Sequence, residues 1–355
     1  MYRILTINPG STSTKLAVYH DDKETLSQNL SHSAAELAQF ANIIDQLEYR
    51  LAKIQDFLHA NSLSPADFSA IVARGGLLKP MLSGTYAIND VMLADLSSAR
   101  YGDHASNLGA ILAQRLAKES GCPSFIVDPV VVDELSDLAR ISGLPELPRK
   151  SIFHALNQKA VAKRFAKRIG RPYGELNLIV AHLGGGISVG CHRQGQVVDV
   201  NNALNGDGPF SPERAGTLPA EQLADYVLRN HLTGAEIAKK IAGSGGLVAH
   251  LGLNDVREVQ KLVASGDKKA QQVYEAMIYQ VARSIAAAAV PVCGKVDYIL
   301  LTGGIAHSEY ITGKLKEYIG FIAPVTVIPG ENELQALAEG ALRVLTQEED
   351  ALQYQ

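Results

Sequence analysis

Two blocks of the chain share one pattern of hydrophobic and polar positions. In the first block, the mostly apolar residues 3–7 are followed by a small, polar turn over residues 8–14, and the strand pattern resumes over residues 15–19. In the second, the apolar residues 178–181 precede a stretch with three glycines, after which residues 187–190 resume an extended pattern. Each block predicts a strand, a tight turn and a second strand, then another turn and a third strand. The repetition favours two related domains that face one nucleotide over a chance similarity between hairpins.

The first turn of the second block, Gly184 to Gly186, is suited to binding an anion. Glycine has no Cβ, so the backbone of such a turn can approach a ligand closely. Successive backbone N–H groups in a turn of this kind make a cradle for a phosphate. Taken alone, the stretch is equally compatible with an ordinary hairpin that has a flexible tip.

Between the two blocks, the spacing of apolar residues predicts one helix over residues 34–61 and two short buried strands, 70–73 and 124–127. Arg74 and Asp128 directly follow these strands. The carboxyl ends of strands in an α/β sheet usually border the ligand crevice, so both side chains are candidates for a binding site. A surface arginine beside a turn and a turn-forming aspartate before proline are the simpler alternatives.

Residues 143–148 are rich in glycine and proline and predict a linker between two domains. We therefore expect an N-terminal domain over residues 1–148, completed by the C-terminal helix 335–355, and a nucleotide-binding domain over residues 149–334. His154 begins a predicted helix at this linker, although a histidine there is often a packed or capping residue. The basic residues 159–171 of the same helix are expected to form a solvated face.

The remainder of the second domain alternates helices with two strands. A long loop, 205–216, has no periodicity and is expected to face the substrate, because such loops in compact domains are usually functional or disordered. The small residues 302–306 lie between a strand and a helix that starts near Ser308, which is an anion-binding geometry. The tail, 347–355, is expected to be frayed. Helices are predicted over about 219–230, 233–242, 255–265, 268–290 and 333–345, and strands over 296–301 and 325–328.

Length and composition exclude several classes of function. A chain of 355 residues can form two domains, each with its own core. The formal charge of −4 gives no basic footprint for nucleic acid. The three cysteines are far apart and have no metal-binding spacing, which fits buried thiols in a reducing compartment. We find neither a signal peptide nor an apolar stretch long enough to span a membrane, and expect a cytoplasmic protein.

Four motifs, spread over nearly the whole chain, resemble those of the acetokinase family. They are residues 7–15 (INPGSTSTK), 151–154 (SIFH), 181–186 (AHLGGG) and 301–305 (LTGGI). The resemblance implies the duplicated actin-like (ribonuclease H-like) α/β fold, with the nucleotide cleft between the two lobes. It also implies reversible phosphoryl transfer between ATP and a short-chain carboxylate, giving an acyl phosphate and ADP, with Mg²⁺ as cofactor. A homodimer or larger homo-oligomer is expected on the same ground.

The resemblance also assigns roles to individual residues. Arg74 matches the arginine that holds the carboxylate, Asp128 the catalytic aspartate, and His154 and Arg214 the two groups that stabilise the transition state. Asn8 and Glu333 match the residues near magnesium. Glu331 lies only two positions before Glu333, so a shifted alignment would match Glu331 to the magnesium site instead. The residues that match the nucleotide-binding segments are Asn8, Ser11, Ser13, Lys15, His182, Gly184, Gly185, Gly186, Asp255, Arg257, Gly303, Gly304, Ile305 and His307.

Three departures from the acetate-specific members of the family indicate a different acid. Pro9 replaces an alanine in the first turn, Gly185 replaces an asparagine in the second, and Asn157-Gln158 stand where those members carry Ser-His. These features resemble the butyrate-specific members and favour butyrate or isobutyrate as substrate, with Phe153 and Phe210 as candidates for the apolar acid pocket. Acetate, propionate or another branched acid is the alternative. A non-catalytic actin-like ATP-binding protein and a sugar kinase are alternatives of other classes.

Overall fold

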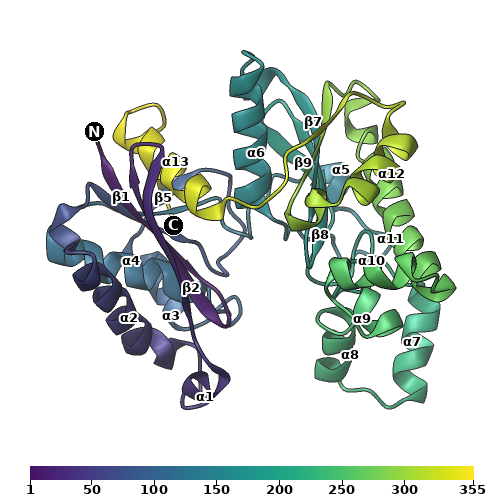
Figure 1. Cartoon of the computed structure of the whole chain (residues 1–355), viewed down its shortest axis with the longest axis horizontal. Helices are drawn as coiled ribbons and strands as arrows, with labels where there is room; N and C mark the ends of the chain where they lie inside the picture. Colours follow the sequence, from purple (N-terminus) through teal and green to yellow (C-terminus); the bar gives the residue numbers. More distant parts are fainter. The chain divides into compact units, whose positions relative to one another are not determined.

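The computed structural model describes residues 1–355, which form two compact units. Unit 1 consists of residues Met1–Val132 and Asn332–Gln355, and unit 2 of Asp133–Glu331 (Figure 1). No helix is long and apolar enough to cross a membrane.

Unit 1 is organised around a seven-stranded sheet with the order β12-β5-β6-β4-β1-β2-β3. β1 pairs antiparallel with β2 and parallel with β4, which in turn pairs parallel with β6. The strands are β1 (Arg3–Pro9), β2 (Ser13–His20), β3 (Lys23–Ser31), β4 (Ala70–Arg74), β5 (Thr85–Ala87), β6 (Ser124–Val127) and β12 (Leu352–Gln353).

Unit 2 repeats this topology in a five-stranded sheet with the order β11-β10-β7-β8-β9. β7 pairs antiparallel with β8 and parallel with β10, as β1 does with β2 and β4. The order β3-β2-β1-β4-β6 therefore corresponds to β9-β8-β7-β10-β11, and the predicted duplicated α/β fold is confirmed. The strands are β7 (Asn177–Leu183), β8 (Ile187–Arg193), β9 (Gln196–Val200), β10 (Tyr298–Thr302) and β11 (Val325–Val327).

Helices cover both faces of the sheet in unit 1. Gly109 of α4 (Asn107–Ser120) lies against Ala73, and Gly340 of α13 (Glu333–Leu345) lies against Val127. Val127 pairs with Arg74, the neighbour of Ala73, so the two helices lie on opposite faces. The other helices are α1 (Ala34–Leu37), η1 (Ile44–Gln46), α2 (Leu47–Ala60), η2 (Pro65–Asp67) and α3 (Asp90–Ser97).

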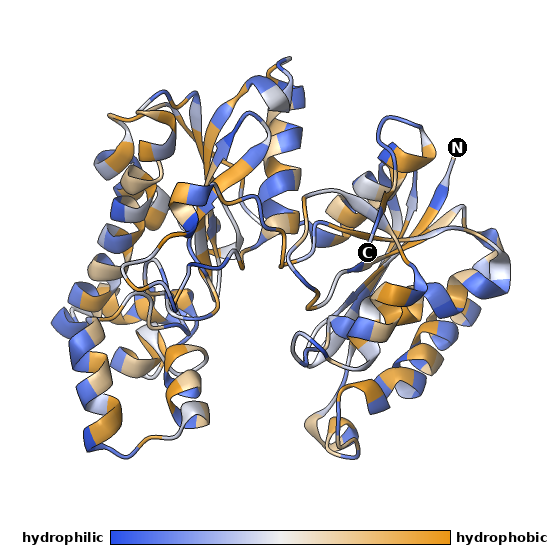
Figure 2. Cartoon of the chain, turned by 180° about the vertical axis from the view of Figure 1, so that it is seen from behind, coloured by the Kyte–Doolittle hydropathy of each residue, from blue (hydrophilic) through white to orange (hydrophobic).

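Alternate residues of β7 divide the core of unit 2 into two layers. Leu178 and Val180 pack with residues of α6 (Ala155–Arg168), while Ile179 and Ala181 pack with α11 (Lys268–Ala287) and α12 (Glu309–Ile319). Figure 2 shows the hydrophobic central strands and the mixed colouring of the helices. The remaining helices are α5 (Asp137–Arg140), η3 (Tyr173–Glu175), α7 (Ala220–Arg229), α8 (Gly234–Ile241), α9 (Gly246–Leu251), α10 (Val256–Ala264), η4 (Val290–Val292) and η5 (Gly304–His307).

One helical prediction was wrong, and one helix was not predicted. Residues 34–61 do not form one helix, because the backbone N–H of Asn42 donates to the Asp45 carboxylate (2.9 Å) in a turn that separates α1 from α2. The glycine-rich stretch near residue 245 starts an unpredicted short helix, α9. α8 begins with a side-chain cap, since the Thr233 hydroxyl accepts from the backbone N–H of Glu236.

The segment 133–148, placed by prediction in the N-terminal domain, packs with unit 2. The Glu134 carboxylate accepts from Lys159 Nζ (2.6 Å) and from the backbone N–H of Val197 (2.7 Å). Lys159 is only 1% exposed, so it is not part of a solvated face as predicted. A buried charge requires a partner, and Glu134 provides it.

The C-terminal tail is anchored, contrary to the prediction of fraying. β12 pairs with β5, and the ring of Tyr354 is buried. The Tyr354 hydroxyl donates to the Asp95 carboxylate (2.8 Å), and Asn89 Nδ2 donates to the Tyr354 carbonyl (2.6 Å). The prediction of buried thiols was also only partly right, because Cys191 is buried but Cys122 is half-buried and Cys293 is exposed.

Candidate active site

The glycine turn between β7 and β8 is held by the loop that follows β9. Ser211 Oγ donates to the Gly185 carbonyl (2.6 Å), and the backbone N–H of Glu213 donates to the same oxygen (3.4 Å). The guanidinium of Arg214 occupies the space that a Cβ at Gly186 would require. The glycine is therefore needed for the arginine to lie directly over the turn.

A cavity of about 680 Å³ lies beside this turn in unit 2. Its volume is within the range of typical small-molecule sites. Asp255 caps α10 and pairs with Arg257 (2.6 Å), and hydrogen bonds from the side chain and backbone of Arg257 lower the pKa of Asp255 to about 2. Seven of the residues predicted to bind nucleotide line the cavity: Gly184, Gly185, Asp255, Arg257, Gly304, Ile305 and His307.

Four further residues of the same cavity were not predicted as site residues: Asn254, Val256, Gln260 and Ser308. Pro212, which also lines the cavity, belongs to the loop 205–216 that was expected to face the substrate. Gln260 Nε2 donates to Ser308 Oγ (2.6 Å), which ties α10 to the start of α12. Ser308 carries a recognisable signal, because it is the N-cap of α12. Gly303 does not line the cavity but packs against the backbone of Leu183 with a positive φ of 89°.

The structure brings two predicted histidines into contact. The rings of His154 and His182 stack with centroids 3.8 Å apart and an angle of 9° between their planes. His154 Nδ1 lies 2.9 Å from Ser188 Oγ, and His182 Nδ1 lies 2.9 Å from Asn157 Oδ1. Asn157, one of the departures from the acetate-specific pattern, thus holds a histidine of the site.

Glu331 also belongs to this part of unit 2. Its backbone carbonyl accepts from Asn157 Nδ2 (2.7 Å), and its carboxylate lies 3.5 Å from His182 Nε2. Glu333, two residues further on, lies in unit 1. The two glutamates, which the sequence could not separate, therefore belong to different units.

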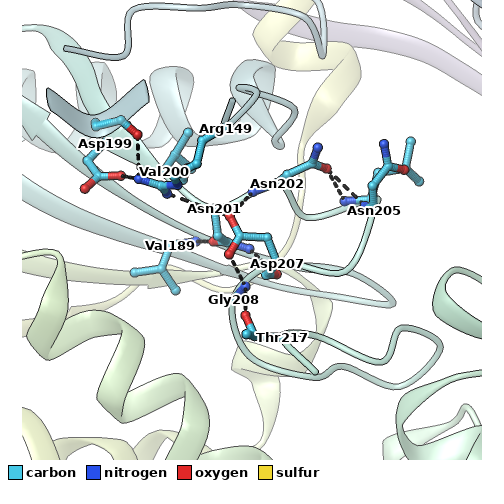
Figure 3. Close-up of polar contacts among 12 residues, drawn as sticks. Arg149, Val189, Asp199, Val200, Asn201, Asn202, Asn205, Asp207, Gly208 and Thr217 are labelled. Carbon is cyan, nitrogen blue, oxygen red and sulfur yellow. Dashed lines mark hydrogen bonds and ion pairs between the residues drawn. The ribbon is translucent and has the colours of Figure 1, made fainter. Parts of the chain in front are cut away.

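A polar network fixes the loop that carries Arg214 (Figure 3). Arg149 donates to Asp199 (2.9 Å), and Asn201 Nδ2 donates to the Asp207 carbonyl (3.1 Å). The backbone N–H of Gly208 lies within hydrogen-bond distance of the Thr217 hydroxyl (3.0 Å). The Arg214 guanidinium donates to the Ala203 carbonyl, and burial lowers its pKa from the ordinary arginine value.

The two phenylalanines proposed for the acid pocket are both buried. Phe153 is 2% exposed. Phe210 is 8% exposed and belongs to the hydrophobic core of unit 2, with its ring centroid 6.1 Å from that of His250. The backbone N–H of Phe210 donates to Gln280 Oε1 (3.3 Å). The loop around Phe210 is therefore packed on unit 2.

In unit 1, Glu333 joins two other predicted residues. Asn8 Nδ2 donates to Glu333 Oε2 (2.6 Å), and Arg74 pairs with Glu333 Oε1 (3.1 Å). Asp128 is 3% exposed and accepts from Ser83 Oγ (2.6 Å) and from the backbone N–H of Gly84 (2.8 Å). Its backbone has a φ of 38°, a strained conformation that is seen more often at functional sites than elsewhere.

The turn between β1 and β2 is held by a residue that the sequence analysis missed. Arg50 of α2 is fully buried and donates to the carbonyls of Gly10 (3.0 Å), Ser11 (3.3 Å) and Ser13 (3.2 Å). Burial lowers its pKa from the ordinary arginine value. Ser11 and Lys15 are exposed at this turn, and Ser13 is half-buried.

Asn8 and Glu333 fit a magnesium ion by ligand type. Mg²⁺ prefers oxygen ligands and usually takes one or two carboxylates, with phosphates and waters completing its shell. The Asn8 amide oxygen and the Glu333 carboxylate supply oxygens of this kind. The structure contains no cluster of three or more His, Cys, Asp or Glu side chains that could hold a metal.

The duplicated fold is also found in solved structures of an acetate kinase and a propionate kinase. The structure matches acetate kinase from Porphyromonas gingivalis with a TM-score of 0.78 and 18% identity, over 96% of this chain and 99% of that chain. It matches a propionate kinase from Francisella tularensis with a TM-score of 0.76 and 20% identity, over 96% of this chain and 99% of that chain. These similarities confirm the fold.

Sequence comparisons identify the family. A profile described as the acetokinase family matches residues 146–318. Butyrate kinase 2 from Clostridium acetobutylicum is 53% identical over 353 residues, 99% of each chain, and butyrate kinase 1 from the same organism is 51% identical over 354 residues, 100% of each chain. This chain belongs to the acetokinase family, as its motifs predicted.

Proposed function

We propose that this chain catalyses the reversible transfer of a phosphoryl group from ATP to butyrate, giving butanoyl phosphate and ADP. The observation that carries the proposal is the 53% identity, over 99% of each chain, with a protein named butyrate kinase 2. The residues to which the family resemblance assigns this chemistry, including Arg74, Asp128, His154 and Arg214, support the proposal.

The carboxylate is the nucleophile. It is already ionised at neutral pH, so no general base is needed. One of its oxygens attacks the γ-phosphorus in line, while the bond from that phosphorus to the β–γ bridging oxygen breaks and ADP departs. We assign Arg74 to holding the carboxylate, and His154 and Arg214 to stabilising charge on the transferred group.

Asp128 is assigned the role of an orienting group rather than a proton acceptor. The hydrogen bonds from Ser83 and Gly84 fix its carboxylate in one position. A covalent phosphoenzyme on Asp128 or Glu333 is the alternative mechanism, and it would require two successive phosphoryl transfers.

The cavity in unit 2 is assigned to the nucleotide, with its phosphates on the turn Gly184–Gly186. Asn8 and Glu333 would hold magnesium, which when bound neutralises charge on the phosphates. Arg74 already pairs with Glu333 (3.1 Å), so this carboxylate is shared between a protein cation and the proposed metal site.

Selectivity for the acid is expected to be modest. One methylene group of the acid in an apolar pocket changes the free energy of transition-state binding by roughly 1–3 kcal/mol. Phe153 remains our candidate for the pocket, while the packing of Phe210 in the core of unit 2 favours a structural role for that residue. Acetate, propionate and other branched acids remain the alternative substrates.

The experiment is hydroxamate trapping of the acyl phosphate formed from Mg-ATP, with acetate, propionate, butyrate, isobutyrate and a hexose as acceptors. We expect a butyrate or isobutyrate optimum that is lost in His154→Ala. An acetate optimum would contradict the acid assignment. ADP release with the hexose, without acyl phosphate from any acid, would support a sugar kinase. ATP binding with neither ADP release nor acyl phosphate would support a non-catalytic ATP-binding protein.

We also propose a homodimer or larger homo-oligomer, from the family resemblance. Two helices of unit 2, α7 and α8, bury none of their residues within the chain, and Leu228 of α7 is 73% exposed. Sedimentation equilibrium of the purified chain tests this assignment, and a monomer at micromolar concentration would contradict it.

A further inference from the structure

A continuous series of hydrogen bonds in unit 2 leads from a tyrosine to the His154 ring. Tyr173 Oη lies 2.7 Å from His192 Nδ1, and His192 Nε2 lies 3.0 Å from Gln158 Oε1. Gln158 Nε2 lies 2.8 Å from Ser188 Oγ, which lies 2.9 Å from His154 Nδ1. Gln158, Ser188 and His192 are fully buried, so water does not compete for these bonds.

The direction of the series is set at Gln158. Its amide nitrogen also lies 3.1 Å from the backbone carbonyl of Ser188, which can only accept a hydrogen bond. The amide nitrogen therefore faces Ser188, and the amide oxygen faces His192. Consequently His192 carries its proton on Nε2, and its Nδ1 accepts from the Tyr173 hydroxyl.

The surroundings of His192 favour the neutral form of its ring. Burial, followed by the nearby charge of Lys159, lowers the pKa of His192 well below the ordinary value. A neutral imidazole has one donor nitrogen and one acceptor nitrogen, as the direction of the series requires.

The Ser188 hydroxyl has two lone pairs and one proton. The lone pairs accept from Gln158 Nε2 and from the backbone N–H of His154 (3.5 Å). The proton is then directed to His154 Nδ1, which must accept it. In a neutral His154 ring, the ring proton consequently resides on Nε2.

We propose that Gln158 and Ser188 are positioning residues that hold His154 as the Nε2–H tautomer, so that Nε2 donates to the phosphoryl group in transit. The role in catalysis rests on the proposed function, but the tautomer does not. The opposite tautomer would direct a lone pair at phosphoryl oxygens and would repel them. In this proposal, Gln158, which stands where the acetate-specific members carry a histidine, orients the Ser188 hydroxyl toward His154.

Two matched variants test the proposal. Thr and Val have nearly the same shape, so Ser188→Thr keeps the hydroxyl and Ser188→Val removes it. We expect ¹⁵N spectra of histidine-labelled protein, assigned with His154→Gln, to show the Nε2–H tautomer in the wild type and in Ser188→Thr. In Ser188→Val we expect a mixture of tautomers and a kcat about ten- to a hundredfold lower, with KM for butyrate nearly unchanged.

An Nδ1–H tautomer in the wild type would overturn the proposal, as would identical spectra and kcat in the Thr and Val variants. If the added methyl group prevents folding, Gln158→Met keeps the volume of the side chain and removes its donor. The same spectral change is expected there, and an unchanged tautomer would again overturn the proposal. The ¹⁵N spectra report the tautomer without any turnover. A failure of the proposed reaction would therefore appear in the kinetics and leave the spectral test unaffected.

Discussion

At the scale of single residues, the candidate site depends on side chains that hold other side chains. Arg214 lies over the glycine turn because residue 186 has no Cβ, and its guanidinium is fixed by the Ala203 carbonyl. His154 and His182 are stacked, and each is bonded through Nδ1 to a separate neutral partner, Ser188 or Asn157. Groups fixed in this way need little reorganisation when charge develops on a substrate.

Gly186→Ala tests the position of Arg214. The backbone at residue 186 does not need a positive φ, so alanine should be tolerated by the main chain. The new methyl group would displace the Arg214 guanidinium, and we expect kcat to fall by about a hundredfold or more. Steady-state kinetics measure the effect, and circular dichroism checks the fold.

Gly313→Ala is the matched control for Gly186→Ala. Gly313 lies in α12, and a Cβ there meets no atom within 4 Å. Alanine also favours a helix more than glycine does, so stability should not fall. Equal activity of the two variants would contradict the assignment of Arg214.

At the scale of elements, two turns occupy equivalent places in the repeated topology. One joins β1 to β2 and the other joins β7 to β8, and both were predicted to bind nucleotide. They are held in different ways. Arg50 binds the carbonyls of the first turn, whereas the loop with Ser211 and Glu213 binds the Gly185 carbonyl of the second.

Arg50→Met tests the first turn. Methionine keeps much of the apolar stem but removes the donors, so the carbonyls of Gly10 and Ser11 and the side-chain oxygen of Gln46 each lose a hydrogen bond. Each unsatisfied buried group costs about 1–3 kcal/mol, and we expect the free energy of unfolding to fall by about 2–4 kcal/mol. Urea unfolding gives this value.

The KM for ATP should rise in Arg50→Met, because the turn would no longer be fixed. Arg115→Met is a control of the same type at an exposed position, where the ion pair with Glu48 is worth less than about 1 kcal/mol. A loss of stability as small as that of the control would show that Arg50 does not hold the turn.

The elements that were predicted well are those specified by local sequence. β6 occupies residues 124–127 as predicted, because a short apolar run lies between Pro123 and Asp128. The tail was mispredicted because its order comes from Tyr354 bonding to Asp95, 259 residues away. Arg50 was missed for a similar reason: within a helical pattern it looks like any surface arginine, and only the folded turn surrounds it.

At the scale of the whole molecule, the duplicated topology places part of the predicted site in each unit. Arg74, Asp128 and Glu333 belong to unit 1, while His154, His182, Arg214 and Glu331 belong to unit 2. Family resemblance could identify most of these residues from sequence. The sequence could not assign the two glutamates to their neighbours, because the division between the units falls between Glu331 and Asn332.

The most direct test of the proposed reaction follows the carboxylate oxygen. The chain would be incubated with Mg-ATP and butyrate labelled with ¹⁸O in both carboxyl positions, and the products observed by ³¹P NMR. We expect butanoyl phosphate whose phosphorus resonance is shifted upfield by one bridging ¹⁸O, because a butyrate oxygen forms the new bond to phosphorus. Release of ADP with only unlabelled phosphate, or an acyl phosphate without ¹⁸O on phosphorus, would contradict carboxylate phosphorylation by this chain.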